Sequence, residues 1–351
     1  MAKMYRAGIV GCGGMGRSHA KAWTEHPAVE LVSVADIDKG VAQHFAEEFD
    51  VPEVFADYHE MYRDAALDVV SIPTWQGVRA EIAVAAADAG IRGIIGEKPM
   101  ASALGEANEM IEACDRNGAK LVIGHQNRFN PTNTEIRRLV AGGAIGQPTL
   151  LYERAKPMAG LLNTGTHGID LWRYFLSDPE TSWVIGQTSR TSDRWERRSR
   201  CEDLCMGLVC FEGGTRAVYE GDLPQPGVEM PRIYGTEGKI TTGEGGVVLL
   251  QTHELSGWRE IHPTPEPKNQ YEEFIDWLEE KIPEHRSTGR QARYTLEIMM
   301  AIYESLRIKN VVVMPLEIRE SPLELMVQDG TLPVIKEGRY DIRRPFPEEQ
   351  R

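Results

Sequence analysis

A run of glycines near the N-terminus could hold the phosphates of a dinucleotide. It follows a short apolar segment, opens a stretch with helical spacing, and consists of Gly11, Cys12, Gly13, Gly14, Met15 and Gly16. In this G-x-G-x-x-G pattern the first glycine permits a tight turn, the second lets the main chain approach a pyrophosphate, and the third lets helix and strand pack closely. The helix N-terminus adds an attraction for the phosphate charge.

An acidic residue then stands where such a fold binds ribose. Asp36 ends the second apolar segment, about twenty residues after the last glycine of the motif. Its carboxylate would accept hydrogen bonds from the adenosine ribose and would repel a 2′-phosphate, and neither Ile37 nor Asp38 offers an arginine to bind one. The pattern predicts NAD rather than NADP as cofactor. The alternative is a glycine turn that binds nothing.

A lysine follows another apolar segment, in the stretch Gly96-Glu97-Lys98-Pro99. Ligands of open α/β sheets bind beyond the carboxyl ends of the strands, so Lys98 would stand where a substrate lies. Its amine could hydrogen-bond a hydroxyl and stabilise the oxyanion that develops as hydride leaves carbon. The Lys98–Pro99 bond is a candidate for the cis form. The alternative is a surface lysine in a turn.

A histidine is the third candidate for chemistry. His167 lies at the start of a predicted helix, within the stretch Leu161–Asp170. Histidine titrates near neutral pH, so His167 could take the proton of a hydroxyl that is being oxidised. A histidine at this place could instead cap or pack the helix.

The elements that must position these residues change in kind along the chain. Residues 1–125 alternate strand-like and helical segments, as a parallel sheet with crossover helices requires. Residues 126–351 contain strand-like segments separated by glycine turns, together with a few helices. We therefore expect an α/β chain with an N-terminal Rossmann dinucleotide-binding domain over 1–125. An α+β domain with a large, mostly antiparallel sheet, for substrate binding and oligomerisation, is expected over 126–351.

The composition argues against several other classes of protein. The 351 residues carry a net charge of −14 with a pI near 5.2, which disfavours nucleic acid and anionic membrane surfaces as partners. No apolar run reaches the ~18 residues of a membrane span, and the first residues leave no room for a signal peptide. We therefore expect a cytoplasmic protein. The five cysteines show no zinc-ribbon spacing, so we expect buried, reduced thiols and no metal site.

Taken together, these motifs resemble those of the Gfo/Idh/MocA oxidoreductases. The resemblance covers nearly the whole chain and rests on the glycine motif, Glu97-Lys98-Pro99, Gly124–Pro131 and Gly165-Thr-His167-x-x-Asp170. It implies that Lys98 orients the reacting hydroxyl and that His167 is the general acid/base. It also implies contacts of the cofactor with Ile37, Pro73, Thr74, Glu97 and Gln126, and contacts of the substrate with Asn163. Arg128 lies at the carboxyl end of the last strand predicted for the N-terminal sheet, so it could hydrogen-bond hydroxyls or a carboxylate of the substrate. A salt bridge joining the domains is an equal alternative for Arg128.

Three departures from the family pattern matter. The family usually has an aspartate four residues before the histidine, where this chain has Asn163. An amide can hydrogen-bond substrate or His167 but cannot supply the charge that stabilises an imidazolium. We therefore expect His167 to be a weaker base, or Lys98 to carry more of the proton transfer. The segment 148–163 is also short, and Arg79 stands where relatives often have histidine, with no role assigned to it.

These observations predict an NAD-dependent dehydrogenase acting on a secondary hydroxyl of a sugar, glycoside or cyclitol, or on the matching ketone. Two alternatives stay open: a redox-neutral enzyme that keeps NAD bound during glycoside cleavage or isomerisation, and a non-catalytic NAD-binding regulator. Retention of both Lys98 and His167 argues against a regulator. The expected substrate is a small carbohydrate or polyol, and the resemblance implies a homodimer or homotetramer.

Overall fold

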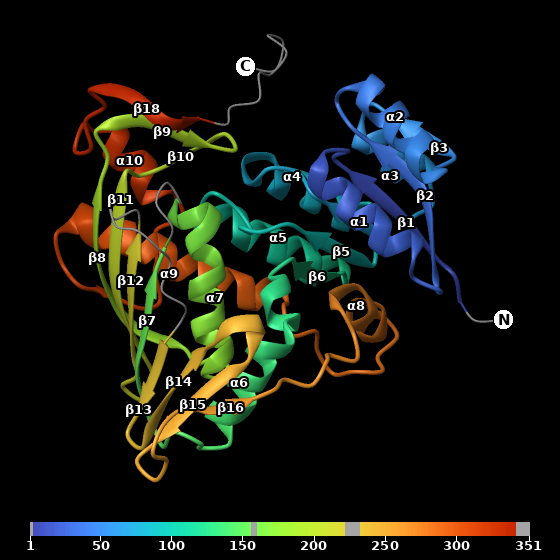
Figure 1. Cartoon of the computed structure of the whole chain (residues 1–351). Coiled ribbons are helices and arrows are strands. Elements are labelled where there is room, and N and C mark those ends of the chain that lie inside the picture. The colour runs from blue at the N-terminus through green and yellow to red at the C-terminus, as the bar shows by residue number, and fades with distance from the viewer. Residues whose placement is uncertain (1–2, 156–159, 222–231, 342–351) are drawn as a thin grey trace. The chain divides into compact units, whose positions relative to one another are not determined.

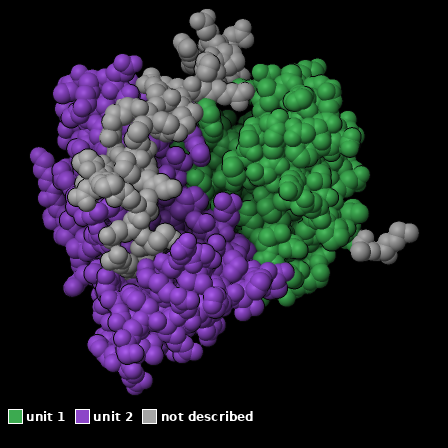
Figure 2. All heavy atoms as spheres, viewed as in Figure 1, with its two compact units in different colours: residues 1–101, 106–124, 268–292 green, residues 102–105, 125–267, 293–351 purple. Residues whose placement is uncertain are grey.

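The computed structural model describes residues 3–155, 160–221 and 232–341. The chain forms two compact units (Figure 2). The first consists of residues 1–101, 106–124 and 268–292, and the second of residues 102–105, 125–267 and 293–351. The structure thus groups 268–292 with the N-terminal residues, whereas the sequence analysis places them in the second domain. The change of unit at residues 124 and 125 lies next to the boundary expected from the sequence.

The sheet of the first unit has six strands in the order β3-β2-β1-β4-β5-β6, all parallel (Figure 1). This is the strand order of dinucleotide-binding folds, so the expected Rossmann architecture is confirmed. Because parallel strands end at one edge, the segments after β1, β4 and β5 lie along the same edge of the sheet. The strands are β1 (Tyr5–Val10), β2 (Val29–Ala35), β3 (Glu53–Phe55), β4 (Val69–Ile72), β5 (Gly93–Gly96) and β6 (Lys120–Ile123).

Among the described residues, six helices accompany this sheet. One of them, α8, comes from much later in the chain and packs into the core of the first unit, where Tyr271 lies edge-on to Trp23 with ring centroids 4.9 Å apart. Phe274 and Leu278 approach β5 so closely that a Cβ at Gly93 would lie 2.9 Å from each. This apolar packing is why 268–292 belong to the first unit. The helices are α1 (Gly14–Thr24), α2 (Lys39–Phe49), α3 (Tyr58–Asp64), α4 (Gln76–Asp88), α5 (Leu104–Asn117, of which 106–117 belong here) and α8 (Gln270–Leu278).

The second unit contains a nine-stranded sheet in the order β16-β15-β14-β13-β7-β12-β11-β8-β17 (Figure 1). Every neighbouring pair is antiparallel except β7 and β12, which confirms the expected large, mostly antiparallel sheet. The strands are β7 (Pro148–Arg154), β8 (Thr181–Ser189), β11 (Leu204–Phe211), β12 (Arg216–Gly221), β13 (Arg232–Gly235), β14 (Gly238–Thr242), β15 (Val248–Thr252), β16 (Arg259–Ile261) and β17 (Val312–Val313).

Four helices and a small three-stranded sheet complete the described part of this unit. A π-helical turn, Leu161–Gly165, leads directly into α7 (Thr166–Phe175). The other helices are α6 (Pro131–Ala141), α9 (Gly289–Ile308, of which 293–308 belong here) and α10 (Pro322–Gln328), and the small sheet holds β9 (Ser192–Glu196), β10 (Ser199–Arg200) and β18 (Lys336–Asp341). Among the described residues, no helix is both long and apolar enough to cross a bilayer.

All five cysteines are free and buried, as expected from the sequence. A run of charged residues such as 194–200 usually forms a solvated face, but here part of the run is buried. Arg194 is fully buried in the second unit, where it pairs with Glu196 at 2.7 Å and donates to the carbonyl of Glu202 at 2.9 Å. Its charge is compensated inside the fold, which is the condition for burying a guanidinium.

Candidate functional site

The glycine motif has the geometry of a phosphate loop. Gly11 adopts φ +106°, a conformation that side chains disfavour. A Cβ at Gly16 would lie 2.3 Å from the carbonyl oxygen of Gly11, so only glycine lets α1 start this close to β1. A Cβ at Gly13 or Gly14 would meet nothing within 4 Å, so the main chain is uncovered where α1 begins. These features fit a pyrophosphate bound at the N-terminus of α1.

Asp36 is fixed beside this loop by main-chain hydrogen bonds. Its Oδ2 accepts the N–H of Cys12 at 2.9 Å, and its Oδ1 accepts the N–H of Asp38 at 3.0 Å. Each carboxylate oxygen can accept a second bond, so the oriented carboxylate suits a ribose diol. The thiol of Cys12 is buried, and burial, reinforced by the charge of Asp36, raises its pKa to about 12. Cys12 therefore contributes its main chain rather than a reactive sulfur, and Ile37 is exposed next to the carboxylate.

The segment after β4 approaches the same loop. A Cβ at Gly11 would lie 3.1 Å from Cγ2 of Thr74. The hydroxyl oxygen of Thr74 is buried and has no hydrogen-bond partner among the described residues. A buried hydroxyl next to the glycine motif fits a role in cofactor contact, because such a group gains from a polar partner. Pro73 precedes it and is half-buried.

Glu97 and Lys98 follow β5, and Glu97 is the anchored member of the pair. Its carboxylate is buried and lies 3.2 Å from Nε2 of His19, while the N–H of Lys98 donates to it at 3.3 Å. Burial alone would raise the pKa of Glu97, but the hydrogen bond and charge of His19 hold it below the usual value. Lys98 is half-buried, and the Lys98–Pro99 bond is cis, as the sequence analysis anticipated.

His19 is a residue that sequence reasoning missed. It lies in α1, three residues after Gly16, and is fully buried. Its Nδ1 lies 3.1 Å from Oγ of Ser71 in β4, and the same oxygen accepts the indole N–H of Trp23 at 2.7 Å. The glycine-loop helix is therefore tied through one imidazole to β4 and to the residue before Lys98. The one feature of the sequence that points to His19 is its position just after the glycine motif.

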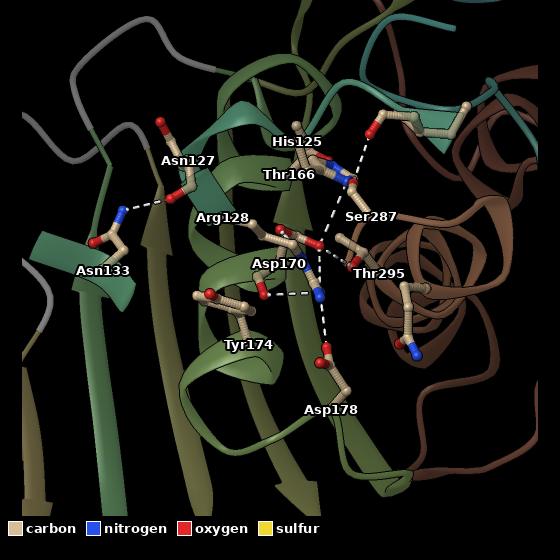
Figure 3. A network of polar contacts seen from close by, with 12 residues as sticks. His125, Asn127, Arg128, Asn133, Thr166, Asp170, Tyr174, Asp178, Ser287 and Thr295 are labelled. Carbon is tan, nitrogen blue, oxygen red and sulfur yellow. Dashed lines mark hydrogen bonds and ion pairs between the residues drawn. The ribbon is translucent and has the colours of Figure 1, made fainter. Parts of the chain in front are cut away.

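In the second unit, His167 stands in the first turn of α7 and Asn163 in the π-helical turn before it. Both side chains are half-buried. The imidazole of His125 lies edge-on to that of His167, with ring centroids 6.5 Å apart. Nε2 of His125 lies 3.0 Å from Oγ1 of Thr166, and its Nδ1 lies 3.4 Å from Asp170 (Figure 3). His125, which sequence reasoning did not single out, thus contacts two members of the motif that contains His167, namely Thr166 and Asp170.

Arg128 is fully buried in the same network. Its Nε and one Nη each lie 2.8 Å from a carboxylate oxygen of Asp170, and that Nη also lies 2.8 Å from Asp178 (Figure 3). Despite burial, which would raise it, the pKa of Asp170 is lowered by the charges of Arg128 and His125. Of the two roles weighed from the sequence, these contacts are those of a salt bridge, and both partners lie in the second unit. Gln126, two residues earlier, is exposed.

Glu153 is a third titratable residue, after His19 and His125, that sequence reasoning missed. It lies in β7, and its carboxylate packs against Gly168, the residue after His167. A Cβ on Gly168 would lie 1.6 Å from Oε2 of Glu153. Burial raises the pKa of Glu153 from the ordinary value of 4.5 to about 7. No signal in the sequence places a residue of this strand beneath the histidine motif.

These features define the class of protein. A parallel sheet in dinucleotide-binding order, a glycine loop with an uncovered main chain and an oriented carboxylate make the first unit a dinucleotide-binding domain. A lysine follows β5 at the same edge of the sheet, where ligands of such folds bind. The chain is of the class of dinucleotide-dependent oxidoreductases.

Comparison with family models identifies the family. Residues 5–125 match the model described as an oxidoreductase family with an NAD-binding Rossmann fold, and residues 151–241 match the model of the GFO/IDH/MocA C-terminal domain. The two matches together cover more than half of the chain. The protein belongs to the Gfo/Idh/MocA family of oxidoreductases, and NAD is its cofactor, as the sequence predicted.

Individual relatives are similar at moderate identity. D-apiose dehydrogenase of Paraburkholderia graminis is 25% identical over 289 residues, which are 76% of this chain and 74% of that protein. Inositol 2-dehydrogenase of Salmonella typhimurium is 30% identical over 185 residues, 49% of this chain and 55% of that enzyme. Among solved structures, levoglucosan dehydrogenase in complex with NADH and levoglucosan superposes with a TM-score of 0.76 at 21% identity, covering 89% of this chain and 100% of that chain. This last likeness is one of fold.

Proposed function

We propose that the protein oxidises a secondary hydroxyl of a sugar, glycoside or cyclitol with NAD, or reduces the matching ketone. The similarity to D-apiose and inositol 2-dehydrogenases supports this substrate class. The observation that carries the proposal is the place of Lys98, two residues after the end of β5, at the sheet edge where the glycine loop follows β1. Bound NAD supplies hydride transfer to or from a substrate carbon.

Lys98 would hold the reacting oxygen. Its ammonium donates hydrogen bonds and stabilises the negative charge that develops on a hydroxyl oxygen as hydride leaves the carbon. The buried carboxylate of Glu97 supports this role, because it accepts the main-chain N–H of Lys98 and fixes the start of the loop. Ile37, Pro73, Thr74, Glu97 and Gln126 are proposed cofactor contacts in addition to the glycine motif and Asp36.

His167 would take the hydroxyl proton. It lies in the first turn of α7, and Asp170 of the same helix is held by Arg128 and His125, which anchors this part of the helix. Asn163, in the turn before α7, would hydrogen-bond the substrate or the imidazole without adding a charge. His167 is accordingly proposed as a weaker base than a histidine beside an aspartate, with Lys98 sharing the proton transfer.

Assembly into a homodimer or homotetramer is proposed as well. Ile185 of β8 and Met206 of β11 are exposed large apolar side chains in the nine-stranded sheet. Exposed apolar residues on a sheet are a common feature of isologous interfaces. Light scattering coupled to gel filtration would measure the mass in solution, and a monomer would contradict the proposal.

The decisive experiment follows NADH absorbance with NAD or NADP over a panel of sugars, glycosides, uronates and inositols. Lys98→Ala tests the site, and Lys21→Ala, a well-exposed lysine of α1, is the matched control. NADH formed from one substrate class, abolished in the first variant and kept in the second, would support the dehydrogenase. If no substrate yields NADH while NAD copurifies with the protein, the redox-neutral enzyme becomes the better account, or the regulator if Lys98→Ala also leaves the biological function intact.

A further inference from the structure

Arg79 is a fully buried arginine whose hydrogen bonds go to main-chain oxygens of two different loops. It lies in the first turns of α4 and is 1% exposed. One Nη donates to the carbonyl of Pro99 and, at 3.3 Å, to that of Met100. The other Nη donates to the carbonyl of Thr74. The guanidinium therefore joins the segment after β4 to the segment after β5.

The surroundings of Arg79 are shaped to accept it. A Cβ at Gly96, the last residue of β5, would lie 3.0 Å from Cδ of Arg79, so glycine gives the side chain its path. The charge of Arg79 also contributes, after His19, to lowering the pKa of the buried Glu97. Burying a guanidinium is costly unless its donors and its charge find partners. Here carbonyl oxygens accept hydrogen bonds from both Nη atoms, and the carboxylate of Glu97 is close enough for its pKa to respond to the charge.

The two joined loops carry different parts of the proposed chemistry. Thr74 lies against the glycine loop, where the cofactor binds, and Lys98 directly precedes the proline whose carbonyl Arg79 binds. The relative placement of these loops sets where the lysine stands with respect to the bound cofactor. Displacements of about 1 Å at such positions can lower a rate by about a hundredfold.

We propose that Arg79 is a positioning residue that sets the spacing between the cofactor-contacting loop at Thr74 and the lysine loop at Lys98. Its effect on NAD binding requires only the family's cofactor, and its effect on turnover rests on the proposed function of Lys98. Arginine is suited to the task because its planar fork of donors reaches carbonyls in two directions. A lysine carries the same charge on a single nitrogen and cannot span both loops in this way.

The test compares Arg79→Met and Arg79→Lys with the wild-type protein. The affinity for NAD is measured by fluorescence titration, kcat and KM by NADH formation, and the melting temperature by calorimetry. Arg190→Met is the matched control, because Arg190 is an equally buried arginine of the second unit whose Nε donates to the carbonyl of Cys201 at 3.0 Å. We expect Arg79→Met to bind NAD about tenfold more weakly and to lose about a hundredfold in kcat with little change in the KM for the substrate. Arg190→Met should lose thermal stability but keep the affinity for NAD.

Each outcome decides for or against the proposal. Arg79→Lys should keep most of the thermal stability yet recover only part of the NAD affinity, and it provides the test if Arg79→Met fails to fold. Wild-type NAD affinity in both Arg79 variants, or an equal loss in Arg190→Met, would overturn the positioning role. If no substrate in the panel yields NADH even with the wild-type protein, the proposed function fails, while the NAD titrations still decide the role of Arg79.

Discussion

Each unit contains a buried histidine held between a hydroxyl and a carboxylate, and the two arrangements differ in how the carboxylate is compensated. In the first unit His19 lies between Ser71 and Glu97, and in the second His125 lies between Thr166 and Asp170. Asp170 also receives two 2.8 Å hydrogen bonds from Arg128. Glu97 has a histidine rather than an arginine at hydrogen-bond distance from its carboxylate.

The difference indicates that the Arg128–Asp170 pair is a fixed structural anchor, whereas Glu97 is held by weaker contacts. Arginine stays charged at any pH that the fold survives, so the Arg128–Asp170 pair is a fixed element beneath the histidine motif. Glu97 precedes the proposed catalytic Lys98 and depends on weaker partners, so changes there should affect function before they affect folding. Variants of the two networks should therefore differ in kind as well as in size.

Breaking the anchor should have the largest effect. Arg128→Met leaves Asp170 and Asp178 buried without their guanidinium, which should lower the free energy of unfolding by roughly 3–5 kcal/mol. Urea denaturation measures the loss. The control is Arg138→Met, which removes an exposed pair with Glu135 and should cost less than about 1 kcal/mol. Equal losses in the two variants would show that the buried network is not an anchor.

The buried carboxylate of Glu153 shows the effect of burial when burial is the cause of the pKa shift. The pKa of Glu153 is raised to about 7 by burial, so the native state holds a proton that the unfolded state releases above pH 4.5. This residue therefore makes the protein less stable as pH rises from about 4.5 to 7, and the full penalty persists above pH 7. Glu153→Gln should be more stable than the wild type at pH 8 by about 1–3 kcal/mol. Denaturation curves at pH 5 and pH 8 would contradict this if the variant gained nothing at the higher pH.

Glu97 should respond to pH in the opposite direction. Its pKa is lowered in the folded state, so its contribution is fully present above the ordinary carboxyl pKa and is lost as pH falls through the folded value. Glu97→Gln should be less stable than the wild type by about 1–2 kcal/mol at neutral pH, with the gap narrowing below about pH 4. Urea midpoints between pH 3 and pH 7 measure this. A gap that stays constant over the whole range would mean that the charge of Glu97 does not matter.

The smallest expected effect concerns the histidine proposed to act on substrate. Asn163→Asp would add near His167 a carboxylate of the kind that His19 and His125 already have. The added charge should raise the pKa of His167, moving the acidic limb of the pH–rate profile to higher pH, with a change of about three- to tenfold in kcat at neutral pH. Asn127→Asp, on the neighbouring turn, serves as the control. Limbs that do not move would argue that His167 is not the base.

Local patterns in the sequence were enough to predict the first sheet and the cofactor. The glycine motif and Asp36 lie within one βαβ unit, where spacing along the chain translates directly into geometry. The parallel pairing of β7 with β12, inside a mostly antiparallel sheet, is not predictable from turn patterns, because no turn joins the two strands. Chain order alone places helix α8 with the later residues, whereas the structure groups it with the first unit, because its apolar side chains pack against Trp23 and Gly93, far away in the sequence.

The candidate site divides in the same way. Lys98 and His167 could be selected because each sits in a short motif. The residues that hold them in place could not be selected from the sequence. His19 contacts Glu97, and Arg128 contacts Asp170, across long separations in the chain. The sequence alone does not show which charged side chains meet. Arg79 was noticed only as a departure from the family pattern, and its hydrogen bonds to main-chain oxygens leave no trace in residue types.

The contact between Glu153 and Gly168 also constrains how this enzyme can evolve. The carboxylate occupies the volume that any side chain at position 168 would need. A lineage that first shortens residue 153 is free to acquire alanine or serine at 168 later. In the reverse order, the carboxylate of Glu153 has to move aside before a side chain fits at position 168, in the turn that carries His167. Across descendants of this protein the two positions should therefore tend to vary together.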